Sequence, residues 1–459
     1  MKDNDDFITL HFADNAFYIL RILYFTNCEI CIMMPVMEIK MPKTDYLRWR
    51  IENVREALKV RRVVVITGAR QTGKTTLAKQ VLDISKNPFK PLDVKQYFDA
   101  AKLDPSDFVK NNLGTMLIDE IQKVPELISE IKYVVDNDNR NGQYLLTGSA
   151  NIQSLPSVRE SLAGRVRSIR LRPLTQGEIL GHKPHFLKMA FDGKFPKRLD
   201  GWDKEAVFDL AFRGGYPEAV RLKTQKERKD WSKDYIDAII ENDMRDVANI
   251  TRQHALRDLI WVMAAWSGRF MDLSKIGAQM GLTRPTITSY INTLEALYLF
   301  ERVRPWIKTD YERAGRGYKT FATDTGFMAS VLDWKQKEVL ADLEVANTDR
   351  AGKLMETLVF QELSAQIDID EECGLYQYRD RDRHEIDFII ERTDGAIVGV
   401  EVKASSSVSG DDFKPQKWFR ENIIKNKVPY RGIVLYTGAD TLSFGDGMLA
   451  VPIAALWAE

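Results

Sequence analysis

A glycine-bounded run in the first third of the chain has the residue types and spacing needed to bind phosphate. In VVVITGARQTGKTTLAKQVL (residues 63–82), an apolar run leads into G-x-x-x-x-G-K-T, and a helical pattern follows. A strand, a loop and a helix in this order let backbone N–H groups and the helix N-terminus surround phosphate groups. Lys74 is then expected to reach the β- and γ-phosphates of a nucleotide, and the Thr75 hydroxyl to ligate Mg²⁺. The residues expected to hold the nucleotide are Gly68, Ala69, Arg70, Gln71, Thr72, Gly73, Lys74, Thr75, Thr76 and Asp119.

Two acidic residues end the next apolar run, TMLIDEIQKVP (residues 115–125). Asp119 suits contact with Mg²⁺, and Glu120 is placed to polarise an attacking water molecule, which is the task of a general base. By itself, such a run is often only a strand that meets a solvated loop. Its position after a phosphate-binding loop favours the functional interpretation.

A third apolar run, YLLTGSAN (residues 144–151), ends in polar residues at what should be the same sheet edge. Thr147 or Ser149 could contact the γ-phosphate, or could instead cap a helix. The arginine-rich stretch that follows could supply a cation that stabilises charge on a transferring phosphoryl group. We choose Arg165 for this role, in its own subunit or in a neighbouring one.

Charged residues also interrupt two apolar runs near the C-terminus, in HEIDFIIERTDGAIVGVEVKAS (residues 384–405). Asp394-Gly395 is a strong hairpin signal, so the two runs should pair. Because strand side chains alternate between faces, Glu401 and Lys403 should share one face, with Asp387 on the neighbouring strand. These groups could gather around a divalent metal ion. The alternative is an edge hairpin with an ordinary cross-strand ion pair.

The elements that must position these residues follow the chain in order. Alternating β-runs and helical segments over residues 60–180 predict a parallel α/β sheet. The helical pattern from Trp202 to Arg252 predicts either the lid of a nucleotide site or a packing bundle without a mechanical role. In residues 273–303, a short helix from Leu273 to Met280, a turn at Gly281 and a second helix with Pro285 in its first turn predict a helix-turn-helix.

The second helix of this pair has the composition of a helix that reads the major groove of DNA. Its outward residues should be Thr283, Arg284, Thr286, Ser289 and Tyr290. The segment after it predicts a wing, two β-runs around a loop whose cations would contact phosphates: Arg304, Lys308, Arg313, Arg316 and Lys319. The alternatives are a protein-docking module and a solvated basic loop.

Taken together, GARQTGKTT, LIDEIQ, LLTGSAN, LAGR…LRPLTQGE and RGGYPEAV resemble the AAA-type ATPases common in archaea and bacteria. The resemblance spans about residues 45–455. It implies an AAA+ core with ATP and Mg²⁺ as cofactors and with Lys74, Thr75, Asp119 and Glu120 in the roles given above. In that family a C-terminal domain of poorly known function follows the core, and relatives often assemble into rings, so a homo-oligomer is compatible with the resemblance.

The order of a helix with Glu356, a strand with Asp387, a turn, and a strand with Glu401 and Lys403 resembles the PD-(D/E)xK nucleases. The resemblance implies that Asp387 and Glu401 hold Mg²⁺, that Lys403 stabilises the attacking water or the developing charge, and that Glu356 is an auxiliary acid. A nuclease-like fold can also lose its activity and keep a binding role.

Composition sets limits on these interpretations. The 459 residues carry 66 basic and 66 acidic side chains, so no global positive field indicates nucleic acid. Three cysteines indicate a reducing compartment. The apolar stretches near the N-terminus are interrupted well short of membrane-spanning length, and the start MKDNDDF is unlike a signal peptide. We expect a cytoplasmic protein without a membrane span. The first forty residues are either a short strand or helix that packs on the body or residues upstream of the true start, and Met34, Met37 and Met41, which all precede the first clear helix, favour the second interpretation.

The expected fold is α/β: a P-loop NTPase (AAA+) parallel sheet with a helical lid, a winged helix-turn-helix and a restriction-endonuclease-like α/β domain. Expected boundaries are 45–200 for the ATPase core, 201–252 for the lid, 253–330 for the winged helix and 345–459 for the nuclease-like domain, after an extension of doubtful structure over 1–44. The expected function is ATP hydrolysis, binding of nucleic acid, expected to be DNA, through residues 283–319, and Mg²⁺-dependent cleavage of it. The alternative is a nucleotide-dependent switch or scaffold that binds DNA or protein and has an inactive nuclease fold.

Overall fold

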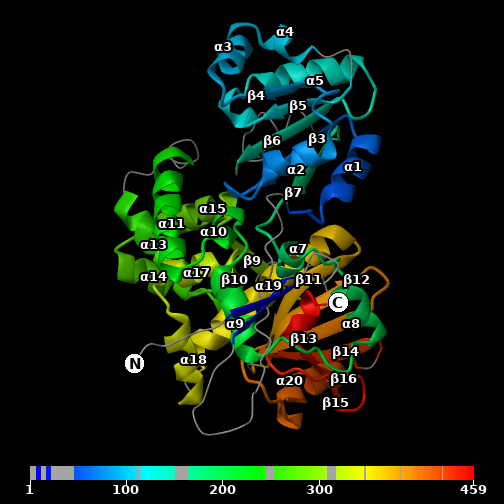
Figure 1. Cartoon of the computed structure of the whole chain (residues 1–459), viewed down its shortest axis with the longest axis vertical. Coiled ribbons are helices and arrows are strands. Elements are labelled where there is room, and N and C mark those ends of the chain that lie inside the picture. The colour runs from blue at the N-terminus through cyan, green and yellow to red at the C-terminus, as the bar shows by residue number, and fades with distance from the viewer. Residues whose placement is uncertain are drawn as a thin grey trace. The chain divides into compact units, whose positions relative to one another are not determined.

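The computed structural model describes residues 7–11, 17–21, 46–110, 114–149, 164–243, 253–307, 317–345, 348–382, 384–425 and 427–458 (Figure 1). The chain divides into two units, Met1–Tyr46 and Leu47–Glu459. In the first unit, β1 (Phe7–His11) pairs antiparallel with β2 (Phe17–Arg21), and both lie in the predicted N-terminal extension. All other described elements belong to the second unit.

A parallel sheet forms the first part of the second unit, in agreement with the predicted α/β pattern. In the described residues it has five strands in the order β4-β5-β6-β3-β7. The strands are β3 (Val63–Gly68), β4 (Phe89–Pro91), β5 (Met116–Asp119), β6 (Tyr144–Ser149) and β7 (Val166–Arg170). The helices that accompany them are α1 (Ile51–Val60), α2 (Lys74–Val81), α3 (Lys95–Leu103), α4 (Pro105–Val109), α5 (Leu127–Asn137) and α7 (Gln176–Leu180).

The central strand β3 is buried on both faces, which is why its sequence is a continuous apolar run. Val64 and Ile66 pack in one cluster with residues of α1 and α2. Val63 and Val65 pack in a second cluster with residues of α3 and α5. The alternation of side chains along the strand thus places helices on both faces of the sheet, and the phosphate-binding loop follows directly from its carboxyl end.

Helices dominate the middle of the chain, as the sequence predicts. They are α8 (Phe186–Asp192), α9 (Lys204–Arg213), α10 (Pro217–Arg221), α11 (Gln225–Ala238), a π-helical turn (Ile239–Asp243), α13 (Gln253–Ala265), α14 (Leu273–Met280), α15 (Arg284–Ala296), α17 (Thr325–Val331) and α18 (Gln336–Glu344). The predicted helix pair has the expected bounds: α14 ends at Gly281 (φ +61°), and Thr283 caps α15. One prediction there is wrong, because Tyr290 is buried in the core rather than exposed.

A mixed sheet with nine described strands forms the rest of the second unit, in the order β15-β16-β14-β13-β12-β11-β9-β10-β8. Its C-terminal strands are β11 (Cys373–Arg379), β12 (Glu385–Arg392), β13 (Ile397–Lys403), β14 (Tyr430–Tyr436), β15 (Leu442–Ser443) and β16 (Met448–Pro452), and β8 (Arg269–Phe270), β9 (Phe300–Pro305) and β10 (Lys319–Ala322) extend it. Strands β12 and β13 pair antiparallel around Asp394-Gly395, as predicted. Strand β14 joins them parallel to β13.

The predicted wing strands β9 and β10 do pair antiparallel, but they do not form a separate hairpin. Strand β9 also pairs with β11, through Arg304 and Tyr376, and β10 also pairs with β8. Both strands therefore lie inside the larger sheet. The loop between them, residues 308–316 with Lys308, Arg313 and Arg316, lies outside the described residues.

Helix α19 (Asp349–Asp370) is the main helix of the C-terminal part and packs against β11 and β13. Leu354, Leu358 and Leu363 of this helix are fully buried in the largest core cluster. Helix α20 (Lys414–Trp418) and a π-helical turn (Phe419–Ile424) follow β13. In the described part of the chain, no helix has the length and apolar character that crossing a lipid bilayer requires.

Candidate functional site

The phosphate-binding loop runs from the end of β3 to the start of α2, and two glycines fix its path. A Cβ atom at Gly68 would lie 2.2 Å from the carbonyl oxygen of Leu171, so no larger residue fits there. Gly73 adopts φ +90°, a left-handed conformation that disfavours other residues. Between them, Ala69 and Thr72 are buried and Gln71 is exposed. The loop is held by its own contacts, since the Thr72 hydroxyl donates to the Ala69 carbonyl at 2.9 Å.

Lys74 is the first residue of α2 and is almost completely buried. Its ammonium donates to the carbonyl oxygens of Gly68 at 3.1 Å and Ala69 at 2.8 Å. The cation therefore lies over the loop itself, where it would meet the phosphates of a nucleotide that enters the loop.

Thr75 and Asp119 meet at the carboxyl edge of the sheet, although 44 residues separate them. The Thr75 hydroxyl lies 2.7 Å from Oδ1 and 3.0 Å from Oδ2 of Asp119, and the Thr147 hydroxyl also contacts Oδ1. Burial raises the pKa of Asp119, and the hydrogen bonds from Thr147 and Thr75 act against that rise. A hydroxyl and a carboxylate beside a phosphate-binding loop fit the donor set that Mg²⁺ takes with a nucleotide.

Glu120 directly follows Asp119 in a left-handed conformation (φ +56°) that starts a short 3-10 turn. Its carboxylate accepts hydrogen bonds from the Gln122 amide and from the Ser149 backbone N–H at 3.4 Å. The Gln122 amide also contacts the Ser149 hydroxyl at 3.0 Å. The structure thus gathers the predicted acids with both predicted contact residues, Thr147 and Ser149, at one end of β5 and β6.

Arg48 is a functional residue that the sequence interpretation missed. Its buried guanidinium donates to the Thr72 carbonyl of the phosphate-binding loop at 2.7 Å, to the Arg172 carbonyl at 2.6 Å and to the Glu178 carboxylate at 3.1 Å. These contacts hold the part of the loop at Thr72 in place relative to the segment that follows β7. No motif marks Arg48, because its partners lie 24 to 130 residues away.

Helix α11 also contacts the loop, and this too was not predicted. The Trp231 indole donates to the Gln71 side chain at 3.1 Å, and the Tyr235 hydroxyl donates to the Arg70 carbonyl at 3.2 Å. The Trp231 and Tyr235 rings stack at 5.0 Å with an angle of 14° between their planes. Because α11 lies in the predicted lid, these contacts give that lid a direct connection to the nucleotide site.

Two other predicted residues contribute less. Thr76 is exposed on α2. Arg165 precedes β7 at the amino edge of the parallel sheet, where Val166 pairs with Val63, whereas the phosphate-binding loop starts at the opposite end of β3. Its side chain forms an ion pair with Asp136. The structure therefore places Arg165 at the edge of the sheet opposite the phosphate-binding loop, and its role, in its own subunit or in a neighbouring one, stays a prediction.

The second predicted site is a cleft of about 540 Å³ in the C-terminal part. Its lining residues are His384, Glu385, Asp387, Glu401, Lys414, Pro415 and Trp418. Asp387 and Glu401 come from the adjacent strands β12 and β13, as expected. The Lys403 ammonium lies 3.5 Å from Glu401 and 3.7 Å from Asp412. Burial, Asp387 and Glu356 together hold the pKa of Glu401 well above its usual range, although Lys403 lowers it.

Lys319 overturns one expectation about this region. Predicted as a wing cation that meets phosphates, it is instead 2% exposed and lies among the carboxylates of the cleft. Its ammonium contacts Glu356 and lies 2.9 Å from Asp387 and 3.0 Å from Glu385. The reason is the position of β10 inside the sheet, which turns this side chain inward.

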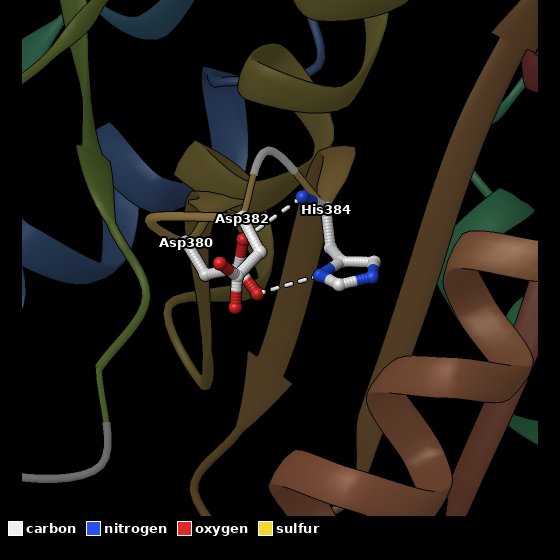
Figure 2. A group of neighbouring side chains, drawn as sticks. All are labelled: Asp380, Asp382 and His384. Carbon is white, nitrogen blue, oxygen red and sulfur yellow. Dashed lines mark hydrogen bonds and ion pairs between the residues drawn. The ribbon is translucent and has the colours of Figure 1, made fainter.

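Among the residues that the structure describes, a different group, Asp380, Asp382 and His384, has its ligand atoms close enough together to share one metal ion (Figure 2). His384 already has two neighbours: its Nδ1 atom lies 2.8 Å from Asp380, and its ring stacks on Trp418 at 3.7 Å. The predicted set of Glu356, Asp387 and Glu401 is not gathered as closely as this group. We assign no ion to either.

Family models match three consecutive regions of the chain. Residues 60–180 match the AAA domain family, residues 204–338 match a domain of unknown function, DUF8612, and residues 351–456 match a second domain of unknown function, DUF4143. The first match coincides with the parallel sheet and its phosphate-binding loop. Residues 60–180 are therefore a P-loop ATPase domain of the AAA type.

Relatives of similar length exist in other organisms. An uncharacterized protein of Mycobacterium tuberculosis is 24% identical over 400 residues, which covers 87% of this chain and 82% of that protein. An uncharacterized protein of Methanocaldococcus jannaschii is 22% identical, with 72% of each chain covered. Among solved structures, a Walker-type ATPase of Pyrococcus abyssi is 14% identical with a TM-score of 0.37, over 61% of this chain and 94% of that chain. The RuvB Holliday junction branch migration motor of Thermotoga maritima is 16% identical with a TM-score of 0.28, over 63% of this chain and 96% of that chain.

Proposed function

We propose that the protein is an ATP-hydrolysing switch that binds nucleic acid, and that ATP occupies the loop between Gly68 and Thr75. The observation that carries the proposal is the contact of the Thr75 hydroxyl with the Asp119 carboxylate at 2.7 Å, beside a loop built around Gly68 and Gly73. Residues from two separate β-α units meet there in the arrangement that phosphoryl transfer requires.

Each residue of this site has a distinct task in hydrolysis. Backbone N–H groups of the loop and the Lys74 ammonium would bind the phosphates and offset the charge that develops on them. Thr75 and Asp119 would hold Mg²⁺, which when bound supplies a positive charge that polarises the phosphate oxygens. Glu120 would orient the attacking water and accept its proton, while Gln122 and Ser149 hold the Glu120 carboxylate in place.

The test of this proposal compares two lysines of α2. Lys74→Ala should abolish ATP hydrolysis, measured as phosphate release, because it removes the cation that lies over the loop. Lys79→Ala is the matched control, since Lys79 is exposed on the same helix and should leave the rate unchanged. Wild-type turnover by the Lys74→Ala protein would contradict the assignment of the nucleotide site.

Nucleic acid binding is the second part of the proposal, and the N-terminus of α15 supports it. Thr283, Arg284 and Ser289 are exposed there, and α14 precedes α15 through a tight turn at Gly281. This pair of helices has the arrangement in which the second helix enters the major groove of DNA. Residues 283–319 remain the proposed contact region, except that Tyr290 and Lys319 are buried.

Binding can be measured by fluorescence anisotropy with a labelled DNA duplex at low salt. Arg284→Ala should weaken binding several-fold and reduce the slope of log affinity against log salt by about one, as expected for one lost phosphate contact. Lys337→Ala, an exposed change on α18, should leave binding unchanged. Equal affinity of the Arg284→Ala and wild-type proteins for DNA would contradict this part of the proposal, and a preference for duplex RNA would redirect it.

The C-terminal cleft has two candidate roles, Mg²⁺-dependent cleavage of nucleic acid and binding of nucleic acid without cleavage. We favour binding, because the Lys319 ammonium lies among the carboxylates that cleavage would need as metal ligands. The wild-type protein should therefore leave plasmid DNA intact in the presence of Mg²⁺ and ATP. Cleavage that disappears in an Asp387→Ala or Glu401→Ala variant would reverse this choice.

A further inference from the structure

Lys319 is the starting point, because it is a buried cation whose partners all come from other elements. It lies on β10, whereas Glu356 lies on α19 and Glu385 and Asp387 lie on β12. Its ammonium contacts all three carboxylates, at 2.9 Å from Asp387 and 3.0 Å from Glu385. These are the lengths of charge-assisted hydrogen bonds between an ammonium and carboxylates.

The resemblance to PD-(D/E)xK nucleases implies a divalent ion at this place, but the residues present do not fit one. Both oxygens of Asp387 are already engaged: Oδ1 with Lys319, and Oδ2 with the backbone N–H of Val402 at 3.0 Å. Glu356 also contacts the Lys319 ammonium. Two of the expected ligand atoms, Oε1 of Glu356 and Oε2 of Glu401, are buried without a hydrogen-bond donor among the described residues, and Oε1 of Glu356 forms an ion pair with Lys319. Mg²⁺ in proteins is usually held by one or two carboxylates together with water, but each carboxylate here already lies beside an ammonium, because Oε1 of Glu401 is 3.5 Å from Lys403.

We infer that the Lys319 ammonium is a built-in cation that takes the place of a divalent metal, and that the cleft binds no such ion while Lys319 lies between Glu356, Glu385 and Asp387. A divalent ion that reached the same carboxylates would lie within a few ångströms of the ammonium. Two cations at that separation repel strongly in a site with little water.

The position of β10 in the sheet holds Lys319 in place, so the fold itself keeps a divalent ion out of the cleft. Lys319 itself pairs with Val303 of β9 and with Phe270 of β8, so its backbone is held on both sides. The ammonium lies between three carboxylates, and it can leave them only if the side chain rotates out of the core or if β10 separates from its neighbours.

The test is Mn²⁺ binding to the full chain without nucleotide, measured from the loss of the free Mn²⁺ signal in electron paramagnetic resonance. The wild-type and Asp387→Asn proteins should bind equal amounts of Mn²⁺. Removal of the cation by Lys319→Met should create one additional site per chain, and Asp387→Asn introduced into that variant should remove it. Lys414→Met is the matched control, because Lys414 lines the same cleft but is 73% exposed and pairs with Asp411. It should behave as the wild type.

A second variant protects the test from misfolding, since Lys319→Met leaves buried carboxylates without their cation. In the double variant with Lys319→Met and Glu385→Gln, one positive and one negative charge are removed together, and Glu356, Asp387 and Glu401 remain. Circular dichroism checks that it folds. One extra Mn²⁺ in this folded protein supports the inference, and no extra Mn²⁺ overturns it.

The comparison of the wild-type protein with the Asp387→Asn variant, in which Lys319 is unchanged, is also decisive. If the wild-type protein binds one Mn²⁺ that Asp387→Asn removes, Lys319 does not exclude the metal and the inference falls. Neither outcome depends on ATP hydrolysis or on nucleic acid binding, so the proposed function stands or falls separately.

Discussion

Glu120 is a residue of the nucleotide site whose role in ATP hydrolysis can be separated from ATP binding. The residues assigned to hold the nucleotide lie on the loop and at Asp119, whereas the Glu120 carboxylate contacts Gln122 and Ser149 instead. A change that removes only its charge should therefore affect the reaction and leave the binding surface in place.

Glu120→Gln should reduce the rate of ATP hydrolysis by about 100-fold or more, because general-base catalysis is worth that much. Its affinity for a fluorescent ATP analogue should stay close to that of the wild type. Glu126→Gln is the control, since Glu126 is exposed and pairs with Lys102 nearby. If the two substitutions have the same effect on phosphate release, Glu120 is not the base.

Sequence and structure agree best where function depends on neighbours along the chain. The loop from Gly68 to Thr75 was predictable, because its glycines and Lys74 act through local backbone geometry. Arg48 and Lys319 were not predictable in their roles, because each acts only through residues far away in sequence. Lys319 lies in a basic stretch that suggested a surface, and only the pairing of β10 on both sides shows that it points inward.

At the scale of elements, α17 shows how a helix start can carry a pH dependence. Asp324 caps α17 by accepting from the Phe327 N–H at 2.7 Å, and it accepts from the Gly215 N–H at 2.6 Å. It is 1% exposed. Burial raises the pKa of Asp324 to about 6, although these hydrogen bonds lower it.

Because the pKa of Asp324 is higher in the folded chain than in the unfolded chain, protonation of its carboxyl group stabilises the folded state. This contribution to the free energy of unfolding is fully present below about pH 4 and is lost as pH rises through about 6. Its size is roughly 3 kcal/mol, from about two pKa units. We expect Asp324→Asn, which keeps a side chain able to cap the helix but cannot titrate, to flatten the pH dependence of stability between pH 4 and 7.

Urea unfolding midpoints at pH 4.5 and pH 7, followed by tryptophan fluorescence, would measure this effect. Asp411→Asn serves as the control, because Asp411 is 78% exposed and should leave the pH dependence unchanged. Parallel changes of the midpoint with pH in the Asp324→Asn and wild-type proteins would show that Asp324 does not titrate in this range.

The bounds of α14 and the start of α15 were predictable, because Gly281 and Pro285 are strong signals for a helix end and a helix start. The wing was predicted as two strands and a loop, and the strands are present. Their partners β8 and β11 were not predictable, since nothing in the local pattern of β9 or β10 identifies a distant strand. Periodicity thus finds an element, but the sheet that contains it depends on long-range pairing.

At the scale of the whole second unit, Arg172 connects three regions of the chain. Its side chain makes two hydrogen bonds to Glu301 on β9, at 2.7 and 3.1 Å, and one to Asp368 on α19 at 2.7 Å, and its carbonyl accepts from Arg48. Burial would raise the pKa of Glu301, but Arg170 and Arg172 lower it to about 2. The ATPase domain therefore meets the following regions through a buried arginine and two half-buried carboxylates.

Arg172→Met should destabilise the protein by up to about 3 kcal/mol, because it removes a buried cation and leaves two half-buried carboxylates with less compensation. The midpoint of thermal unfolding, followed by circular dichroism, would fall accordingly. Arg302→Met is the control: Arg302 is 36% exposed, pairs with Glu295 and should cost less than about 1 kcal/mol. Equal midpoints for the two variants would mean that the buried pairs contribute no more than a surface pair.

The parallel pairing of β9 with β11 has a consequence for how such proteins can evolve. It joins the region that matches DUF8612 to the region that matches DUF4143 within one hydrogen-bonded ladder. A protein that contained either region alone would expose an unpaired edge strand, which could pair with strands of other chains. We therefore expect recombination between relatives to keep these two regions together. A domain that contains a complete sheet of its own could be exchanged more easily.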